Sequence, residues 1–136
     1  MIPSQTVKAP ADRSGRRVSR RWTEPLGGTA ARLASIARSM PEEESLCAQA
    51  ELMKVLGDSG RLRILFALAK AELCVRDLEE LLGASQSLLS HHLATLRAAG
   101  LVKGRREGRA IHYSLDDSHV GALLLLGYEH ARERKS

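Results

Sequence analysis

Apolar side chains recur at helical spacing through the middle of the chain. After Pro41, three glutamates suit the positive end of a helix dipole, and Leu, Met and Val then recur every few residues up to Gly57. A second apolar stripe begins after Asp58 or Ser59, either of which can cap a helix, and runs out near Lys70. This pattern predicts two helices in succession.

A second pair of helices is predicted over residues 78–96. Gly83 lies between them, and glycine readily takes the left-handed conformation that ends a helix. Their spacing is that of a helix-turn-helix, in which the second helix enters the major groove of DNA. That second helix carries Leu89, Leu93 and Leu96 on one face, which predicts that this face is buried.

Another face of the same helix is polar and carries small side chains. Its members are Gln86, Ser87, Ser90 and His91. Such side chains can hydrogen-bond to base edges and phosphates, so we predict that this face binds DNA; an ordinary helical hairpin in a bundle is the alternative. His92 points about 100° away from its neighbour, so the two histidines cannot chelate one ion, and we expect His92 at the flank of the core.

Residues 101–115 predict two short strands joined by a charged turn that contains glycine. Apolar side chains alternate along the second strand at Ile111, Tyr113 and Leu115. A basic hairpin directly after a helix-turn-helix is typical of a wing, whose cations meet phosphates or a minor groove. The candidate cations are Lys103, Arg105, Arg106 and Arg109. A solvated hairpin tip is the alternative, and no partner can be assigned to His112.

Composition limits the chain to one small domain, because it has 136 residues of which 43% are hydrophobic. Residues 1–41 carry 8 Lys or Arg against 2 acids, whereas residues 42–136 carry 13 against 14. We therefore predict a flexible basic N-terminal arm over 1–41, with a short helix near residues 30–38, and a folded domain over 42–136. The charge of the arm either adds nonspecific attraction to DNA or aids solubility.

Cys47 and Cys74 are the only cysteines of the sequence, which argues against a disulfide scaffold and fits a reducing compartment. The longest apolar run, residues 122–126, is far too short to span a bilayer, so we expect a cytoplasmic protein without a membrane partner. Neither a Gly-rich phosphate loop nor a nucleophile-base arrangement is present, so we do not expect an enzyme.

Four residues able to bind a metal stand near the end of the chain in the pattern D-x-H-x10-H-x2-E. They are Asp117, His119, His130 and Glu133. On a continuous helix the two histidines are about 16 Å apart, so no single ion bridges them within one chain. If the last helix packs antiparallel against its copy, each pair supplies half of a tetrahedral site. The pattern thus predicts a metal site and a homodimer together; solvated polar residues on an amphipathic helix are the alternative.

Several motifs follow one another in a specific order. They are residues 72–78, 85–87, 90–93, 101–102 and 108–113. Together they resemble the ArsR/SmtB family of metal-responsive winged-helix repressors over about residues 45–134. The resemblance implies a mainly α fold with a small β-hairpin, a winged helix-turn-helix, and a homodimer formed through the first and last helices. It also implies a repressor, without a small-molecule substrate, that binds operator DNA when metal-free and leaves it when metal binds.

The resemblance matches the four terminal residues to the interfacial zinc site of the family's zinc sensors, with Zn²⁺ preferred and Co²⁺, Cd²⁺ or Ni²⁺ as the other candidate ions. A second family site uses thiolates near the start of the helix-turn-helix. Cys74 and Asp77 match that site, but Arg76 stands where its second cysteine would be. A soft-metal or redox-responsive repressor that senses through Cys74 and Cys47 is the alternative function.

Overall fold

The computed structural model describes residues 28–135, so most of the predicted N-terminal arm lies outside the described residues. The described chain divides into two compact units, of which the first ends at Gln49 and the second begins at Ala50. The predicted boundary between arm and domain, at residues 41 and 42, stays a prediction.

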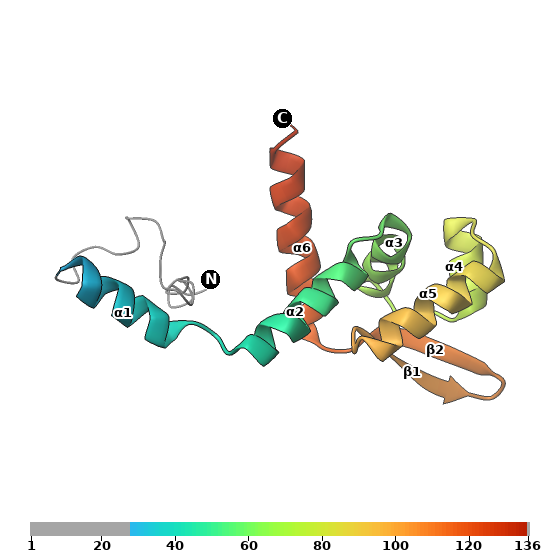
Figure 1. The fold of residues 1–136 in the computed structure, drawn as a ribbon. Coiled ribbons are helices and arrows are strands. Elements are labelled where there is room, and N and C mark those ends of the chain that lie inside the picture. The colour runs from blue at the N-terminus through green and yellow to red at the C-terminus, as the bar shows by residue number, and fades with distance from the viewer. Residues whose placement is uncertain (1–27, 136) are drawn as a thin grey trace. The chain divides into compact units, whose positions relative to one another are not determined.

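The described part of the first unit is helical. Helix α1 covers Thr29–Ser39, which confirms the short helix predicted near residues 30–38, and its Ile36 side chain is buried. Helix α2 covers Glu43–Leu56 (Figure 1), and the boundary between the two units falls within it, after Gln49. Glu43 and Glu44 occupy its first turn, where carboxylates oppose the positive end of the helix dipole.

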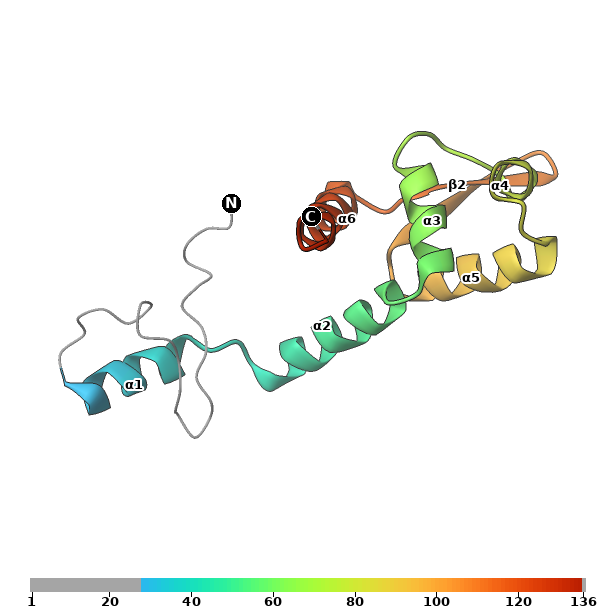
Figure 2. The ribbon, with the colours of Figure 1, turned by 90° about the horizontal axis from the view of Figure 1, so that it is seen from above.

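The second unit is a winged helix-turn-helix followed by a long helix. Its elements are α3 (Ser59–Leu68), α4 (Val75–Leu82), α5 (Gln86–Ala98), β1 (Val102–Glu107), β2 (Ala110–Leu115) and α6 (Ser118–Glu133). In the two views, α3 lies between α4 and α6, and the hairpin runs beside α5 (Figures 1 and 2). The predicted mainly α fold with a β-hairpin wing is confirmed.

Local sequence explains where these helices begin and end. The Asp58 carboxylate caps α3 by accepting from Arg61 N–H at 3.1 Å, and the Ser85 hydroxyl caps α5 by accepting from Leu88 N–H at 3.2 Å. Gly83 ends α4 with φ of 67°, in the left-handed region that the sequence predicts for this glycine. The short helix-turn-helix connection follows from these two adjacent signals.

One hydrophobic core joins the helix-turn-helix to the wing. The predicted apolar face of α5 is buried, since Leu89, Leu93 and Leu96 are 0–1% exposed. They pack in one cluster with apolar side chains from the other elements of the unit: Ile64, Leu65, Leu68, Leu78, Leu101, Val102, Tyr113, Val120 and Leu124. The orientation of α5 relative to the hairpin is therefore set by core packing rather than by surface contacts.

The wing is a two-stranded antiparallel hairpin in which Arg105 pairs with His112. Gly108 has φ of 66° in its turn. Outside the hairpin, Leu73 forms two backbone hydrogen bonds with Tyr113, at 3.1 and 2.8 Å, so the segment before α4 pairs with β2 in a single antiparallel β-bridge. This bridge links the wing to the first helix of the helix-turn-helix.

No helix within residues 28–135 has both the length and the apolar character required to cross a membrane.

Candidate nucleic-acid interface and metal-ligand positions

The polar face predicted on α5 lies on the surface. Its four members are exposed: Gln86, Ser87, Ser90 and His91. Because the opposite face of α5 is held in the core, these side chains are presented by a rigid helix and not by a loop. The arrangement is able to enter a major groove, whose width admits one α-helix.

His92 has a different environment from the residue before it. It is buried, with 9% of its surface exposed, and its Nε2 atom lies 4.0 Å from Asp58 Oδ1 at the start of α3. A Cβ atom added at Gly60 would lie 3.1 Å from both of these atoms, so the absence of a side chain there lets the imidazole approach the cap. The prediction that His92 flanks the core is confirmed.

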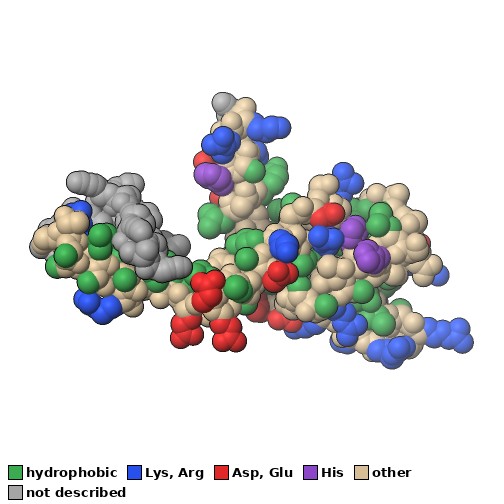
Figure 3. Space-filling model, viewed as in Figure 1, with side chains coloured by type: hydrophobic (Ala, Val, Ile, Leu, Met, Phe, Trp, Pro, Cys, Tyr) green, Lys and Arg blue, Asp and Glu red, His purple; other side chains and the backbone are tan. Residues whose placement is uncertain are grey.

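Lys and Arg side chains gather over the hairpin, as the space-filling view shows (Figure 3). Lys103, Arg106 and Arg109 are exposed, and within the described part of the chain no carboxylate lies within ion-pair distance of them. A surface of this kind attracts phosphates without regard to base sequence. The hairpin thus has the charge required of a wing.

Arg105, the fourth predicted wing cation, is held by two carboxylates. Its Nη2 atom donates to Glu72 Oε1 at 2.6 Å and its Nε atom to Glu72 Oε2 at 3.4 Å, while Nη1 donates to Glu107 Oε1 at 3.3 Å. The bond from Arg105 lowers the pKa of Glu72, and Glu72 in turn raises the pKa of Arg105. Glu107 also faces His112, whose Nε2 lies 3.5 Å away, so His112 has a partner that sequence reasoning did not find.

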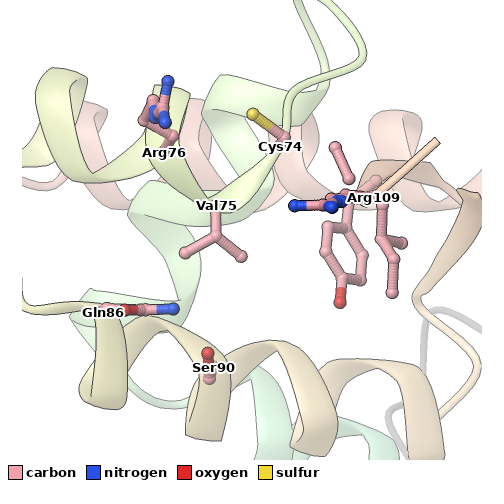
Figure 4. Close-up of a pocket in the computed structure, with 9 residues that line it drawn as sticks. Cys74, Val75, Arg76, Gln86, Ser90 and Arg109 are labelled. Atoms are coloured by element: carbon pink, nitrogen blue, oxygen red, sulfur yellow. The ribbon is translucent and has the colours of Figure 1, made fainter. Parts of the chain in front are cut away.

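A cavity of about 540 Å³ opens between the start of α4, the exposed face of α5 and the hairpin. Its lining residues are Cys74, Val75, Arg76, Gln86, Ser90, Arg109, Ala110, Ile111 and Tyr113. In the close-up, Gln86, Ser90 and Arg109 point into this space from two elements (Figure 4). The fold therefore brings together three of the eight predicted DNA-binding residues around one concave surface.

The predicted ligand pairs lie at opposite ends of α6. Asp117 caps this helix: its Oδ1 atom accepts from His119 N–H at 2.9 Å and from Val120 N–H at 3.3 Å. The His119 imidazole is 93% exposed, and its Nδ1 lies 3.5 Å from the same Oδ1. His130 and Glu133 are exposed in the last turn, three residues apart and thus on one face.

The two pairs do not meet within one chain. Helix α6 is continuous from Ser118 to Glu133, so its rise alone separates His119 from His130 by about 16 Å. In residues 28–135 no group of three or more His, Cys, Asp or Glu side chains is arranged to hold a metal ion.

The cysteines have local partners. The Cys74 N–H donates to Asp77 Oδ2 at 3.0 Å and the thiol to the same oxygen at 3.3 Å, so the predicted second-site pair forms a cap at the start of α4. These bonds lower the pKa of Asp77. In the first unit, Cys47 is exposed and its Sγ atom lies 3.8 Å from Glu43 Oε2.

An apolar groove of about 350 Å³ borders α6 within the second unit. It is lined by Met53, Leu56, Leu62, Phe66, Leu123, Leu124, Gly127, Tyr128 and Ala131. Phe66 and Tyr128 meet edge to face across it, with ring centroids 5.7 Å apart. Leu125 and Leu126 of the same helix are 52% and 63% exposed, so α6 presents an open apolar surface.

Known proteins are similar to this chain in sequence and in fold. Residues 58–103 match the family described as "Bacterial regulatory protein, arsR family". A repressor of Synechocystis, named a transcriptional repressor SmtB homolog, is 46% identical over 84 residues, which are 62% of this chain and 64% of that repressor. The chain thus spans slightly less than two thirds of that relative.

A second relative, from Staphylococcus aureus, is named a cadmium resistance transcriptional regulatory protein CadC homolog. It is 40% identical over 85 residues, and the match covers 62% of this chain and 70% of the relative. The chain belongs to the ArsR/SmtB family. It is accordingly a metal-responsive winged-helix regulator of transcription and not an enzyme.

A solved structure agrees with the fold of this ArsR/SmtB regulator. The homodimeric winged helix-turn-helix DNA-binding domain of a possible ArsR-family regulator from Mycobacterium bovis matches with a TM-score of 0.64 at 30% identity. It covers 69% of this chain and 90% of that chain. The family and fold are established by these matches, whereas the roles of the individual residues stay predictions from their chemistry.

The two aspartate caps predict how stability depends on pH. Arg61 N–H lowers the pKa of Asp58, and the bonds from Cys74 lower the pKa of Asp77, both relative to an ordinary aspartate. A group with a depressed folded pKa stabilises above its unfolded pKa, and this contribution is lost as pH falls through the folded value. We expect the free energy of unfolding to fall below about pH 4, and the Asp58→Asn/Asp77→Asn double variant to show a smaller fall.

Denaturant titrations between pH 7 and pH 3, at one protein concentration, measure this difference. The Asp116→Asn variant, which removes a carboxylate that caps no helix, controls for the loss of charge alone. An acid dependence as steep in the double variant as in the wild type would contradict the role of the caps.

Proposed function

We propose that this regulator is a homodimeric repressor that binds operator DNA when metal-free and leaves it when zinc, or a similar divalent ion, binds between its last helices. The observation that carries the proposal is the position of the four candidate ligands. They are split between the two ends of a helix that exposes large apolar side chains between them, at Leu125, Leu126 and Tyr128. Four ligands can therefore surround one ion only when the last helices of two chains meet.

A second copy is the occupant that suits the apolar surface of α6. Leu125, Leu126 and Tyr128 are more than half exposed, and the groove beside them is lined almost wholly by apolar side chains. Homodimer interfaces are more apolar than the rest of a protein surface. The homodimeric relative from Mycobacterium bovis supports a homodimer here. In the proposed assembly the last helices meet and the first helices contribute.

The donor atoms suit zinc. Two imidazoles and two carboxylates per site give a tetrahedral set of two nitrogens and two oxygens, which Zn²⁺ accepts. Both N–H groups at the start of α6 bind Oδ1 of Asp117, so Oδ2 remains for an ion while the helix cap persists. His119 faces the same carboxylate with Nδ1, an arrangement that orients an imidazole so that Nε2 can be a ligand.

Metal binding would act on DNA through the start of α6. Asp117 follows the wing strand β2 by two residues, and the N–H of its neighbour Asp116 donates to Leu101 O at 2.9 Å, next to β1. A metal ion held by Asp117 would therefore act on the residues at the base of the wing. Two ions per dimer would fix the orientation of the last helices and, with it, the spacing of the two α5 helices. Moving the DNA-bound fraction from 99% to 1% requires about 5.5 kcal/mol of coupling, which two sites can share.

In this proposal DNA is bound by two surfaces. The exposed face of α5 reads base edges, and the basic hairpin contacts phosphates or the adjacent minor groove. We place this protein in the cytoplasm, because its operator DNA lies there. The proposed second metal site at Cys74 and Asp77 has weaker support, because the thiol and the carboxylate already bind each other in the α4 cap.

Zinc-driven release is expected to require His130. In the His130→Ala variant we expect the metal-free affinity for DNA upstream of the gene to stay close to wild type. Each zinc ion that binds should lower that affinity by about 5–150-fold in the wild type, the usual range of allosteric coupling, and zinc should lower it less than about twofold in the variant. Fluorescence anisotropy with and without zinc measures both quantities. The neighbouring Glu129→Ala variant is the matched control and should keep the release; loss of metal-free DNA binding in His130→Ala would contradict the assignment.

Arg105 and Arg106 of the wing are expected to contribute unequally to the salt dependence of DNA affinity. Replacement of Arg106 by Gln should reduce the slope of log affinity against log salt by about 0.9 for each phosphate that this arginine neutralises. Replacement of Arg105 should reduce it less, because Glu72 and Glu107 already neutralise this side chain. Salt titrations of the two single variants compare them directly. Equal reductions would contradict the structural role of Arg105, and no reduction in either would remove the wing from the DNA interface.

A further inference from the structure

The cavity between α4, α5 and the hairpin presents groups that bind anions. Figure 4 shows the Arg109 guanidinium, the Gln86 amide and the Ser90 hydroxyl directed into it, with the Val75 side chain above Gln86 and Ser90. None of its nine lining residues is acidic. A guanidinium beside neutral donors, with no carboxylate present, is the arrangement that proteins use for phosphate groups.

The cavity is large enough for a chemical group rather than a trapped water. Its volume is about 540 Å³, whereas one water molecule occupies about 30 Å³ of liquid. Val75 is also the first residue of α4, so the positive end of that helix dipole adjoins the space. The apolar side chains of Val75 and Ile111 supply walls against which the carbon atoms of a sugar can pack.

Groove geometry determines what passes through this space. Where a helix lies in the major groove and a wing enters the adjacent minor groove, one sugar-phosphate strand separates the two grooves. That strand must cross between the helix and the wing. In this fold, the cavity lies between α5 and the hairpin, so a strand that crosses there would pass over it.

We propose that the cavity binds one phosphodiester group of the operator strand through Arg109, Ser90 and Gln86. The inference rests on the proposed DNA-binding function and adds a specific role within it. Arg109 binds the phosphate oxygens, the small polar side chains of α5 donate to the same group, and Val75 contacts the adjoining sugar. Gln86 and Ser90 then fix the register of the helix on the duplex, which leaves Ser87 and His91 to read bases.

A cysteine placed in the wall tests occupancy of the cavity directly. The full-length Val75→Cys variant, made with Cys74→Ser so that the neighbouring native thiol is removed, retains Cys47 as an internal reference outside the cavity. Alkylation of both thiols is followed by mass spectrometry with and without a duplex from the upstream DNA. At a duplex concentration of about ten times Kd, about one protein in eleven is free, so alkylation at position 75 should slow about tenfold while that of Cys47 is unchanged.

Each result of this experiment bears on the proposal. Protection at position 75 by the duplex, and not by inorganic phosphate at the same phosphate concentration, supports it. Full DNA binding without protection would overturn the cavity assignment and leave the repressor function intact. Equal protection by inorganic phosphate would make the cavity a free-anion site instead. Absence of DNA binding in the wild type would overturn both. If Val75→Cys itself fails to bind DNA, Ala110→Cys on the opposite wall repeats the test.

Two neighbouring arginines provide an independent comparison. Arg109 points into the cavity, whereas Arg76 lies at its edge and points away from it (Figure 4). We expect Arg109→Gln to reduce the salt slope of DNA affinity by about 0.9 for each protomer that binds a phosphate in this way, and Arg76→Gln to reduce it less. The metal-binding stoichiometry should be unchanged in both variants. Equal slopes for the two variants, or no change with Arg109→Gln, would overturn the phosphodiester assignment.

Discussion

Helix α6 keeps its two pairs of candidate ligands about 16 Å apart, because eleven residues at 1.5 Å each separate His119 from His130. The backbone hydrogen bonds of a continuous helix do not allow this distance to shrink. A metal ion bound at all four ligand positions therefore needs two chains, and the exposed apolar surface of the same helix provides a reason for two chains to meet. In this proposal, metal binding, dimerisation and control of DNA binding all depend on the length of one helix.

The start of α6 also connects the proposed metal site to the DNA-binding surface. Asp117 caps α6 two residues after the wing strand β2, and α6 packs against α3 and β2. The core that holds α5 in place includes Val120 and Leu124 of α6, so a change in the position of α6 reaches α5 through packed side chains. Close packing of this kind transmits displacement without a dedicated relay of hydrogen bonds.

Local signals allowed most of the fold to be predicted from the sequence. Three features each depend on residues a few positions apart: the apolar face of α5, the left-handed Gly83 between α4 and α5, and the alternation of apolar residues in β2. Features that depend on distant residues were not predicted. Glu72 and Arg105 are 33 positions apart and meet only because Leu73 pairs with β2. The predicted wing cations therefore were treated as equivalent, although one of them is held in an ion pair.

In the candidate site, too, features set by nearby residues were predicted and features set by distant residues were not. Sequence spacing indicated which residues could bind metal and which could face DNA, because both arguments use the period of one helix. It did not indicate that Arg109 turns toward Gln86 and Ser90, since that juxtaposition requires the hairpin to fold beside α5. Nor did it show that Cys74 and Asp77 bind each other at the start of α4. A cysteine that matches a ligand position in sequence can thus have a structural role.

The most direct test of the central claim is a titration of the dimer, bound to fluorescent DNA from upstream of its own gene, with Zn²⁺, Co²⁺, Ni²⁺ and Cd²⁺ in turn. Anisotropy reports release of the DNA, and native mass spectrometry of the same samples reports the number of ions per dimer. The account predicts that zinc releases the DNA as two ions bind per dimer, with both cysteine thiols still reactive. Release by cadmium but not by zinc, accompanied by loss of thiol reactivity, would contradict it.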